Sequence, residues 1–250
     1  MTDILPGAEP QSWAGGPSGA LVIHGFTGSP QSMRPLAEAF AAAGFTTELP
    51  LLPGHGTSVA DMLETSWDDW SVAAEAAYQD LAGRCEHVVV AGLSMGGTLT
   101  LWLAARHPEI AGIVCINAAA MDQPEMAELL GPLVEAGETT FDAIGNDIAK
   151  KGVTELAYDR TPLLPLMSLA AAIVALQTDL PAIACPVLVL NSPQDHVVPP
   201  ASSDHIASTV GGPVERVTLQ RSYHVATLDH DAEVIAESSI AFALRVCGPN

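Results

Sequence analysis

The chain has 250 residues, of which 48% are hydrophobic and 15% are charged, so it is too apolar for a disordered protein and is long enough for one compact domain. It contains 9 Lys and Arg residues but 29 Asp and Glu residues. The resulting formal net charge of -20 would repel phosphate backbones and anionic lipid head groups, and we expect no nucleic-acid partner.

The cysteines and the apolar segments indicate the cellular setting. The four cysteines lie far apart and form no Cys-x-x-Cys pair, which disfavours a zinc site or a redox dithiol. The N-terminal segment lacks the basic and apolar regions of a secretory signal, and the apolar residues 163–176 are interrupted by Pro165 and Ser168. We therefore expect a soluble cytoplasmic protein without stable membrane insertion, and its oligomeric state stays unknown.

Short β-branched runs alternate with stretches of helical periodicity along most of the chain. The continuous apolar run at residues 20–23 is typical of a strand that is covered on both faces. Strands are expected near residues 20–23, 45–49, 87–91, 112–116, 187–190 and 215–219, and helices near residues 33–40, 66–81, 95–106, 202–210 and 232–246. This alternation predicts an α/β fold with a mostly parallel, doubly wound sheet whose functional loops follow the strands.

The alternation stops after residue 117 and resumes near residue 187. The intervening segment contains helix-like pieces broken by glycines and prolines, and it is rich in Ala, Leu, Ile and Met. We interpret residues 120–178 as an inserted helical cap, called the cap segment below. Residues 1–119 and 179–250 would then form the two parts of the core.

Residues 92–96 read Gly-Leu-Ser-Met-Gly and match the G-x-S-x-G pattern. The pattern alone is weak because it also arises by chance. Here Ser94 lies between a predicted strand and a predicted helix, which is the setting of a nucleophile elbow. Gly92 and Gly96 avoid side chains that would collide across the turn. The alternative is a glycine-rich turn in which Ser94 only caps the helix.

A serine nucleophile needs a base and a carboxylate, which follow the serine in the order acid, histidine on this type of fold. Asp195 follows the predicted strand 187–190, whereas Asp204 falls in a predicted helix and is the weaker candidate. We expect His224 to be the base, because its loop must fold back over the nucleophile. The remaining later histidines are less suitable because they adjoin the acid or fall in or near a helix: His196, His205 and His230.

The first predicted strand ends in His24-Gly25-Phe26-Thr27-Gly28. In hydrolases with a nucleophile elbow, one oxyanion-hole amide comes from such a loop and the other from the residue after the nucleophile. We therefore expect the backbone N–H groups of Phe26 and Met95 to stabilise the oxyanion. His24 is expected to brace this loop by hydrogen bonding. His55 lacks a second ligand at a suitable spacing, so we expect no metal site and no cofactor.

Several segments, in order across residues 19–232, resemble the bacterial monoacylglycerol lipase and carboxylesterase family of α/β-hydrolases: HGFTGSPQSMRPLAEAF, LPGHGT, GLSMGGTLTLWLA, INAA, ELAY, DHVVPP and SYHVATLDHD. The resemblance implies an α/β-hydrolase fold and assigns the same nucleophile, acid, base and oxyanion amides as the reasoning above. It further implies that Glu155 helps to hold a glycerol head group and that Ile144 lines the cap.

The expected function is a serine ester hydrolase that cleaves monoacylglycerols to glycerol and fatty acid through an acyl-enzyme. Its expected partner is a small lipid ester. Three alternatives stay open: a broad-specificity short-chain carboxylesterase, a C–C bond hydrolase with the same triad, and a non-catalytic ligand-binding protein on this fold.

Overall fold

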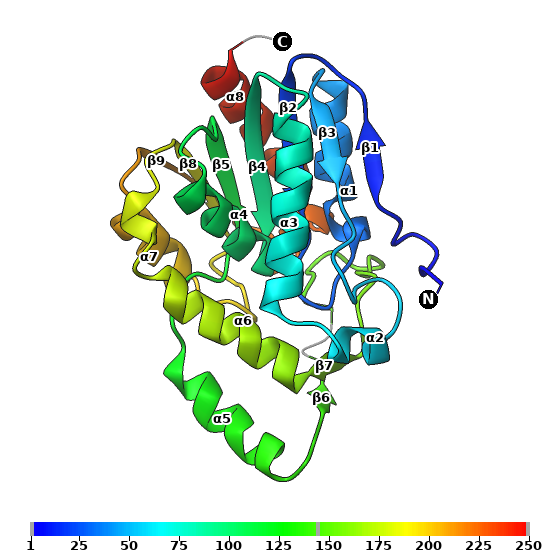
Figure 1. The fold of residues 1–250 in the computed structure, drawn as a ribbon. Coiled ribbons are helices and arrows are strands. Elements are labelled where there is room, and N and C mark those ends of the chain that lie inside the picture. Colours follow the sequence, from blue (N-terminus) through cyan, green and yellow to red (C-terminus); the bar gives the residue numbers. More distant parts are fainter. Residues whose placement is uncertain (1–2, 144–145, 249–250) are drawn as a thin grey trace.

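A seven-stranded sheet forms the centre of the protein, with the strand order β1-β3-β2-β4-β5-β8-β9 (Figure 1). The structure is a computed structural model that describes residues 3–143 and 146–248. The strands of this sheet are β1 (Gln11–Trp13), β2 (Ser18–Ile23), β3 (Thr46–Leu49), β4 (His87–Leu93), β5 (Gly112–Ile116), β8 (Val187–Asn191) and β9 (Val214–Thr218). Neighbouring strands are parallel except β1 and β3, and the mostly parallel sheet is therefore confirmed.

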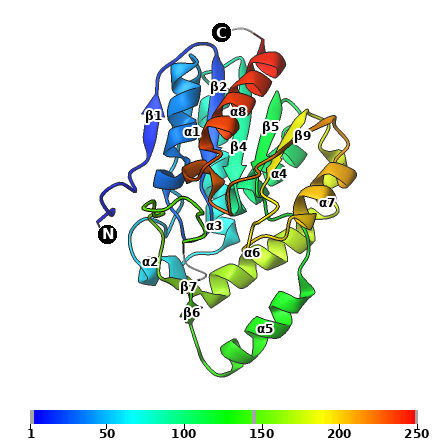
Figure 2. The ribbon, with the colours of Figure 1, turned by 180° about the vertical axis from the view of Figure 1, so that it is seen from behind.

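Helices cover both faces of the sheet. The described helices are α1 (Pro30–Ala42), α2 (Val59–Leu63), α3 (Trp67–Ala82), α4 (Met95–Arg106), α5 (Pro124–Glu135), α6 (Leu163–Leu176), α7 (Ala201–Thr209) and α8 (Ala232–Cys247), with short 3₁₀ turns η1 (Leu180–Ala182) and η2 (Ala226–Leu228). α3 and α4 lie in front of the sheet in Figure 1, and Figure 2 shows α1 and α8 on the opposite face. The sheet is doubly wound, as predicted. None of the described helices is both long and apolar enough to cross a bilayer.

The side chains of β2 show why its sequence is continuously apolar. Leu21 and Ile23 pack into the core beneath α3 and α4, whereas Ala20 and Val22 pack into the core beneath α1 and α8. All four are fully buried. Because successive residues of a strand point to opposite faces, a strand between two helical layers needs an apolar residue at every position.

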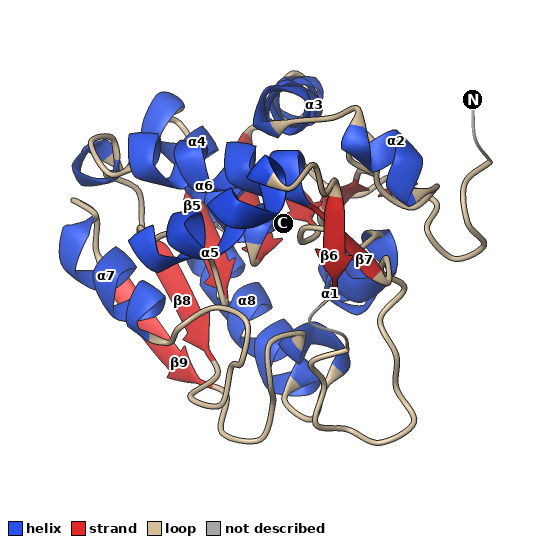
Figure 3. Ribbon diagram, turned by 90° about the horizontal axis from the view of Figure 1, so that it is seen from below, coloured by secondary structure: helices blue, strands red, loops and turns tan. Residues whose placement is uncertain are grey.

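Between β5 and β8 the chain leaves the sheet. It forms α5, then the antiparallel pair β6 (Thr140–Asp142) and β7 (Arg160–Pro162), and then α6. Figure 3 shows α5, α6, β6 and β7 across one end of the molecule. Leu169 and Ile173 of α6 join the core beneath α3 and α4, so this helix is anchored to the main body.

Some elements were not predicted from the sequence. The helical pieces expected between β5 and β8 are present as α5 and α6, but the β6–β7 pair between them was not predicted. β1 and α2 were also missed. β1, β6 and β7 are only three residues long and their partners lie far away in sequence, so no local alternation identifies them.

The turn between β4 and α4 leaves no room for a side chain at Gly92. A Cβ atom there would lie 2.1 Å from the carbonyl oxygen of Gly96. We expect Gly92→Ala to lower the free energy of unfolding by roughly 2 kcal/mol or more in urea denaturation, because backbone would have to move. Gly131→Ala is the control, since a Cβ atom in that part of α5 meets nothing within 4 Å. Equal stability of the two variants would show that the turn accommodates a side chain at Gly92.

Candidate active site

Ser94 lies in a strained turn at the carboxyl end of β4. Its backbone has φ 56° and ψ -118°, a left-handed conformation that costs free energy for a residue with a side chain. The turn is held by a hydrogen bond from the Ser94 amide to the carbonyl of Ile116, 3.0 Å away. α4 begins at the next residue, so the predicted strand–turn–helix context of Ser94 is confirmed.

His224 and Asp195 form a direct hydrogen bond. Nδ1 of His224 lies 2.8 Å from Oδ2 of Asp195, and both side chains are buried. The other carboxylate oxygen, Oδ1 of Asp195, accepts hydrogen bonds from the amides of Val197 and Val198 at 2.8 and 2.9 Å. Because both oxygens accept hydrogen bonds, the carboxylate has a fixed orientation. A carboxylate oxygen can only accept, so Nδ1 of His224 is the ring nitrogen that carries the proton.

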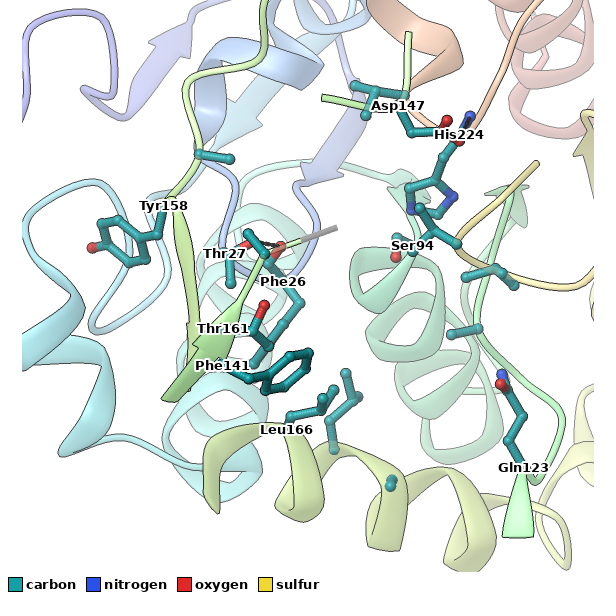
Figure 4. A pocket seen from close by; sticks show the side chains of 18 of the residues that line it. Phe26, Thr27, Ser94, Gln123, Phe141, Asp147, Tyr158, Thr161, Leu166 and His224 are labelled. Atoms are coloured by element: carbon teal, nitrogen blue, oxygen red, sulfur yellow. Dashed lines mark hydrogen bonds between the residues drawn. The ribbon is translucent and has the colours of Figure 1, made fainter. Parts of the chain in front are cut away.

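Ser94 and His224 line one cavity of about 580 Å³, and Figure 4 shows them close to each other at its wall. This volume lies within the usual range for small-molecule sites. The structure therefore brings together three residues that stand 29 to 130 positions apart in the sequence and that were predicted from the sequence as nucleophile, acid and base. Asp204, the weaker acid candidate, instead forms an exposed ion pair with Arg216.

The loop after β2 reaches the same cavity. Phe26 lines it, and a Cβ atom added to Gly25 would lie 3.3 Å from Cβ of Ser94, so this loop passes directly beside the serine. Met95 follows Ser94 as the first residue of α4. Among the residues that the structure describes, no protein acceptor takes a hydrogen bond from the amide of Phe26 or Met95. The expected role of these two N–H groups as oxyanion donors stays a prediction.

A buried aromatic cluster supports the loop of Phe26. The His24 ring spans from the Gly25 carbonyl, 3.0 Å from Nδ1, to the Leu52 amide, 3.2 Å from Nε2. The expected brace is thus confirmed. The His55 ring packs against His24, with centroids 4.9 Å apart, and against Phe26. Burial lowers the pKa of His24 to about 4 and that of His55 to about 3, because neither imidazolium could be hydrated.

Glu155 of the cap segment also lines the cavity. Its Oε1 atom would be 2.7 Å from a Cβ atom built on Gly28, so the carboxylate lies against the loop after β2. Desolvation raises the pKa of Glu155, although His224 and a hydrogen bond from Ser32 act in the opposite direction. Ile144, the other predicted cap residue, lies outside the described residues.

Two further polar residues contact the candidate site, and neither was predicted from the sequence to have a role there. Asn117, at the end of β5, has φ 42° and donates a hydrogen bond from Nδ2 to the carbonyl of His224 at 2.8 Å. Its Oδ1 accepts from the Ser192 amide at 2.8 Å. Asp147 lines the cavity from the cap segment. Asn117 could have been identified from the sequence, because it is a polar residue directly after a buried strand. No local pattern marks Asp147.

The described part of the chain contains no cluster of three or more His, Cys, Asp or Glu side chains that could hold a metal ion. Both nitrogens of His24 are occupied by backbone groups, and Nδ1 of His55 lies 3.0 Å from the carbonyl of Pro53. Neither ring is therefore arranged with further side chains to form such a cluster in this part of the chain.

Residues 20–237 match the model of the family described as "Alpha/beta hydrolase family". The match includes most of the sheet, from β2 to β9, the turn at Ser94 and both loops that carry Asp195 and His224. The chain therefore belongs to the alpha/beta hydrolase family.

More specific similarities come from relatives that align over nearly the whole chain. A thermostable monoacylglycerol lipase of Bacillus sp. (strain H-257) is 47% identical over 98% of both chains. A carboxylesterase of Bacillus subtilis (strain 168) is 26% identical and covers 94% of this chain and 95% of its own. A solved structure reported with LipS and LipT, two metagenome-derived lipolytic enzymes, has a TM-score of 0.93 at 45% identity, covering 97% of this chain and 100% of that chain. Within its family, the protein is a carboxylic ester hydrolase.

The buried histidines make the stability of the protein depend on pH. Because their pKa values are lowered in the folded state, the unfolded chain binds more protons below pH 6.5, and stability falls as the pH decreases. Between pH 6.5 and 4.5, His55 alone accounts for roughly 2 kcal/mol of this loss. We expect His55→Gln to make the decline shallower by that amount in urea denaturation at several pH values.

His87→Gln is the control, because His87 lies exposed at the start of β4 and its ring meets water in both states. The stability of the His87→Gln variant should decline with falling pH as much as that of the unmodified protein. A His55→Gln variant with an unchanged slope would show that His55 does not carry the effect.

Proposed function

We propose that this protein is a serine ester hydrolase that cleaves monoacylglycerols to glycerol and a fatty acid through an acyl-enzyme. The hydrogen bond between His224 and Asp195, at the wall of the cavity that Ser94 also lines, is the observation that carries the chemistry. The near full-length similarity to a monoacylglycerol lipase supports the substrate class.

The proposed reaction begins when the hydroxyl oxygen of Ser94 attacks the acyl carbonyl. Nε2 of His224 accepts the serine proton, and Asp195 stabilises the imidazolium through Nδ1. The N–H groups of Phe26 and Met95 bind the negative oxygen of the tetrahedral intermediate. His224 then returns the proton to the departing glycerol oxygen, which leaves an ester between Ser94 and the fatty acid.

Water completes the cycle. His224 removes a proton from a water molecule as it attacks the acyl-enzyme, and the same two amides stabilise the second tetrahedral intermediate. The serine oxygen then leaves with the proton from His224, and the fatty acid is released. The protein groups suffice for both half-reactions, and the proposal needs no cofactor.

The cap segment, residues 120–178, is proposed to cover the core formed by residues 1–119 and 179–250 and to receive the acyl chain. Apolar side chains of α5, β6 and α6 line the cavity on that side: Leu129, Leu130, Phe141, Leu166, Leu169 and Ile173. Burial of a hydrocarbon chain against them removes apolar surface from water, at about 25 cal/mol per Å². A long acyl chain would therefore bind more tightly than an acetyl group.

Glu155 is proposed to bind the glycerol hydroxyls. Its carboxylate lies beside the loop of Phe26 and close enough to His224 for their charges to interact, so it is on the polar side of the cavity. A carboxylate that accepts hydrogen bonds from hydroxyls would favour a glycerol ester over an ester without such donors. Ile144 is retained as a proposed cap-lining residue.

A broad-specificity carboxylesterase is the second candidate, because the carboxylesterase of Bacillus subtilis is similar over nearly the same length. The two candidates share the chemistry of Ser94 and differ in what holds the alcohol. A cytoplasmic location stays a prediction, and fractionation of the native host with an antibody would test it.

Replacement of the proposed nucleophile and base provides the test of the chemistry. We expect Ser94→Ala and His224→Ala each to lower kcat for monoacylglycerol hydrolysis by roughly 10³-fold or more, and the double variant to lose little beyond that, because the two residues act together. A serine-directed phosphonate should add to Ser94, as determined by peptide mass mapping. Labelling of another serine, or losses that multiply in the double variant, would exclude the proposed roles.

The proposed glycerol contact predicts a change in specificity. We expect Glu155→Ala to raise KM for monoacylglycerols about ten-fold, as for one charge-assisted hydrogen bond, with little change for p-nitrophenyl esters. Glu138→Ala is the control because Glu138 is an exposed carboxylate of the same segment. Equal effects of Glu155→Ala on both substrates would favour the broad carboxylesterase.

A further inference from the structure

Asp147 connects the cap segment to both loops that carry the proposed acid and base. Its Oδ2 atom accepts hydrogen bonds from the backbone amides of His224 and His196, at 3.0 and 3.2 Å. Its Oδ1 atom accepts from Nδ1 of His196 at 2.7 Å, and its main-chain carbonyl accepts from the Val225 amide at 3.1 Å. The carboxylate is 11% exposed and lies beside His224 in Figure 4.

These contacts fall on the residues next to the proposed proton-transfer pair. His196 follows Asp195, so Asp147 binds the N–H of the peptide group that joins Asp195 to His196. The His224 amide belongs to the proposed base itself. The Asp147 carboxylate thus binds the main chain of two loops, and these loops carry the His224 and Asp195 side chains that lie 2.8 Å apart.

The core holds the same residue from the other direction. Asn117 donates to the carbonyl of His224, while Asp147 accepts from its N–H. Asn117 also binds Ser192, on the loop that leads to Asp195. The backbone N–H of His224 is therefore bound by the cap segment, and its backbone carbonyl is bound by the core. Loss of the cap partner would leave a buried amide unpaired, and the loop would shift to hydrate it.

We propose that Asp147 is a positioning residue that aligns His224 with Asp195, so that the proposed base is correctly placed only while the cap segment is seated on the core. This inference rests on the proposed function of Ser94, Asp195 and His224. Asp147 has both oxygens occupied by loop donors, so its role differs from that of Glu155. A shift of His224 by about 1 Å is enough to slow proton transfer by roughly 100-fold.

The test compares Asp147→Ala with Asp147→Asn, using a monoacylglycerol and a p-nitrophenyl ester. We expect Asp147→Ala to lower kcat for both substrates by the same factor, roughly 10- to 100-fold, with little change in KM, and to slow phosphonate labelling of Ser94 equally. Asp147→Asn keeps one oxygen that can accept both backbone amides, and it should retain most of the activity.

Asp142→Ala is the matched control. Asp142 is an exposed carboxylate of β6 that pairs with Arg160 within the β6–β7 pair. The Asp142→Ala substitution should leave kcat and the labelling rate unchanged. If Asp142→Ala slows both substrates as much as Asp147→Ala does, general loosening of the cap segment explains the loss and the positioning role is wrong.

A spectroscopic measurement separates this inference from the proposed function. The proton between Nδ1 of His224 and Asp195 should give a low-field ¹H NMR signal that is absent in His224→Ala. We expect Asp147→Ala to shift or broaden this signal and Asp147→Asn to restore it, at melting temperatures that show both variants to be folded. If the unmodified protein shows the signal but hydrolyses neither ester, the proposed function fails while the alignment can still be measured.

Three results would overturn the inference. An unchanged low-field signal together with unchanged kcat in Asp147→Ala would exclude positioning. A rise in KM for the monoacylglycerol alone would make Asp147 a substrate contact. Equal losses in Asp147→Ala and Asp147→Asn would show that the negative charge is required, and not the acceptor for the backbone amides.

Discussion

The close approach of backbone at the turn after β4 is the constraint on which the site depends. Gly96 lies so near β2 that a Cβ atom there would be 2.2 Å from the carbonyl oxygen of Ile23. This contact brings the start of α4 against the end of β2, and with it Ser94 against the loop of Phe26. The strained backbone of Ser94 is tolerated because the parallel strands and the packed helices on both faces leave the turn no alternative.

The segment between β5 and β8 is attached to the core at both walls of the cavity. On one wall, the Tyr158 amide donates to the carbonyl of Thr27 at 3.1 Å, and the Tyr158 hydroxyl donates to the carbonyl of Gly54. On the other, Asp147 binds the loop of His224, and Asp229 accepts from the amides of Ala149 and Lys150. A displacement of this segment would therefore disturb both the loop of the proposed oxyanion amides and the loop of the proposed base.

Desolvation dominates the electrostatics around the cavity. The protein has a formal charge of -20, yet burial favours the neutral forms of His24, His55 and Glu155 by shifting the pKa of each. The acidic surface and the apolar cavity thus present different environments. An uncharged lipid ester, as proposed for the substrate, has no charge that the surface would repel or that the cavity would have to desolvate.

The sequence by itself determined the alternation of strands and helices, the family, and the residues to consider at the site. These features depend on short stretches of sequence: the apolar run of β2 indicates a buried strand, and the glycines around Ser94 indicate a tight turn. The roles of Ser94, Asp195 and His224 stay predictions, although the fold brings these residues to one cavity. Only the tertiary structure decided the pairing of β6 with β7 and the contact of Asp147 with two distant loops. Such contacts join backbone groups far apart in the chain, and backbone amides are the same for nearly every residue type, so no pattern of side chains records them.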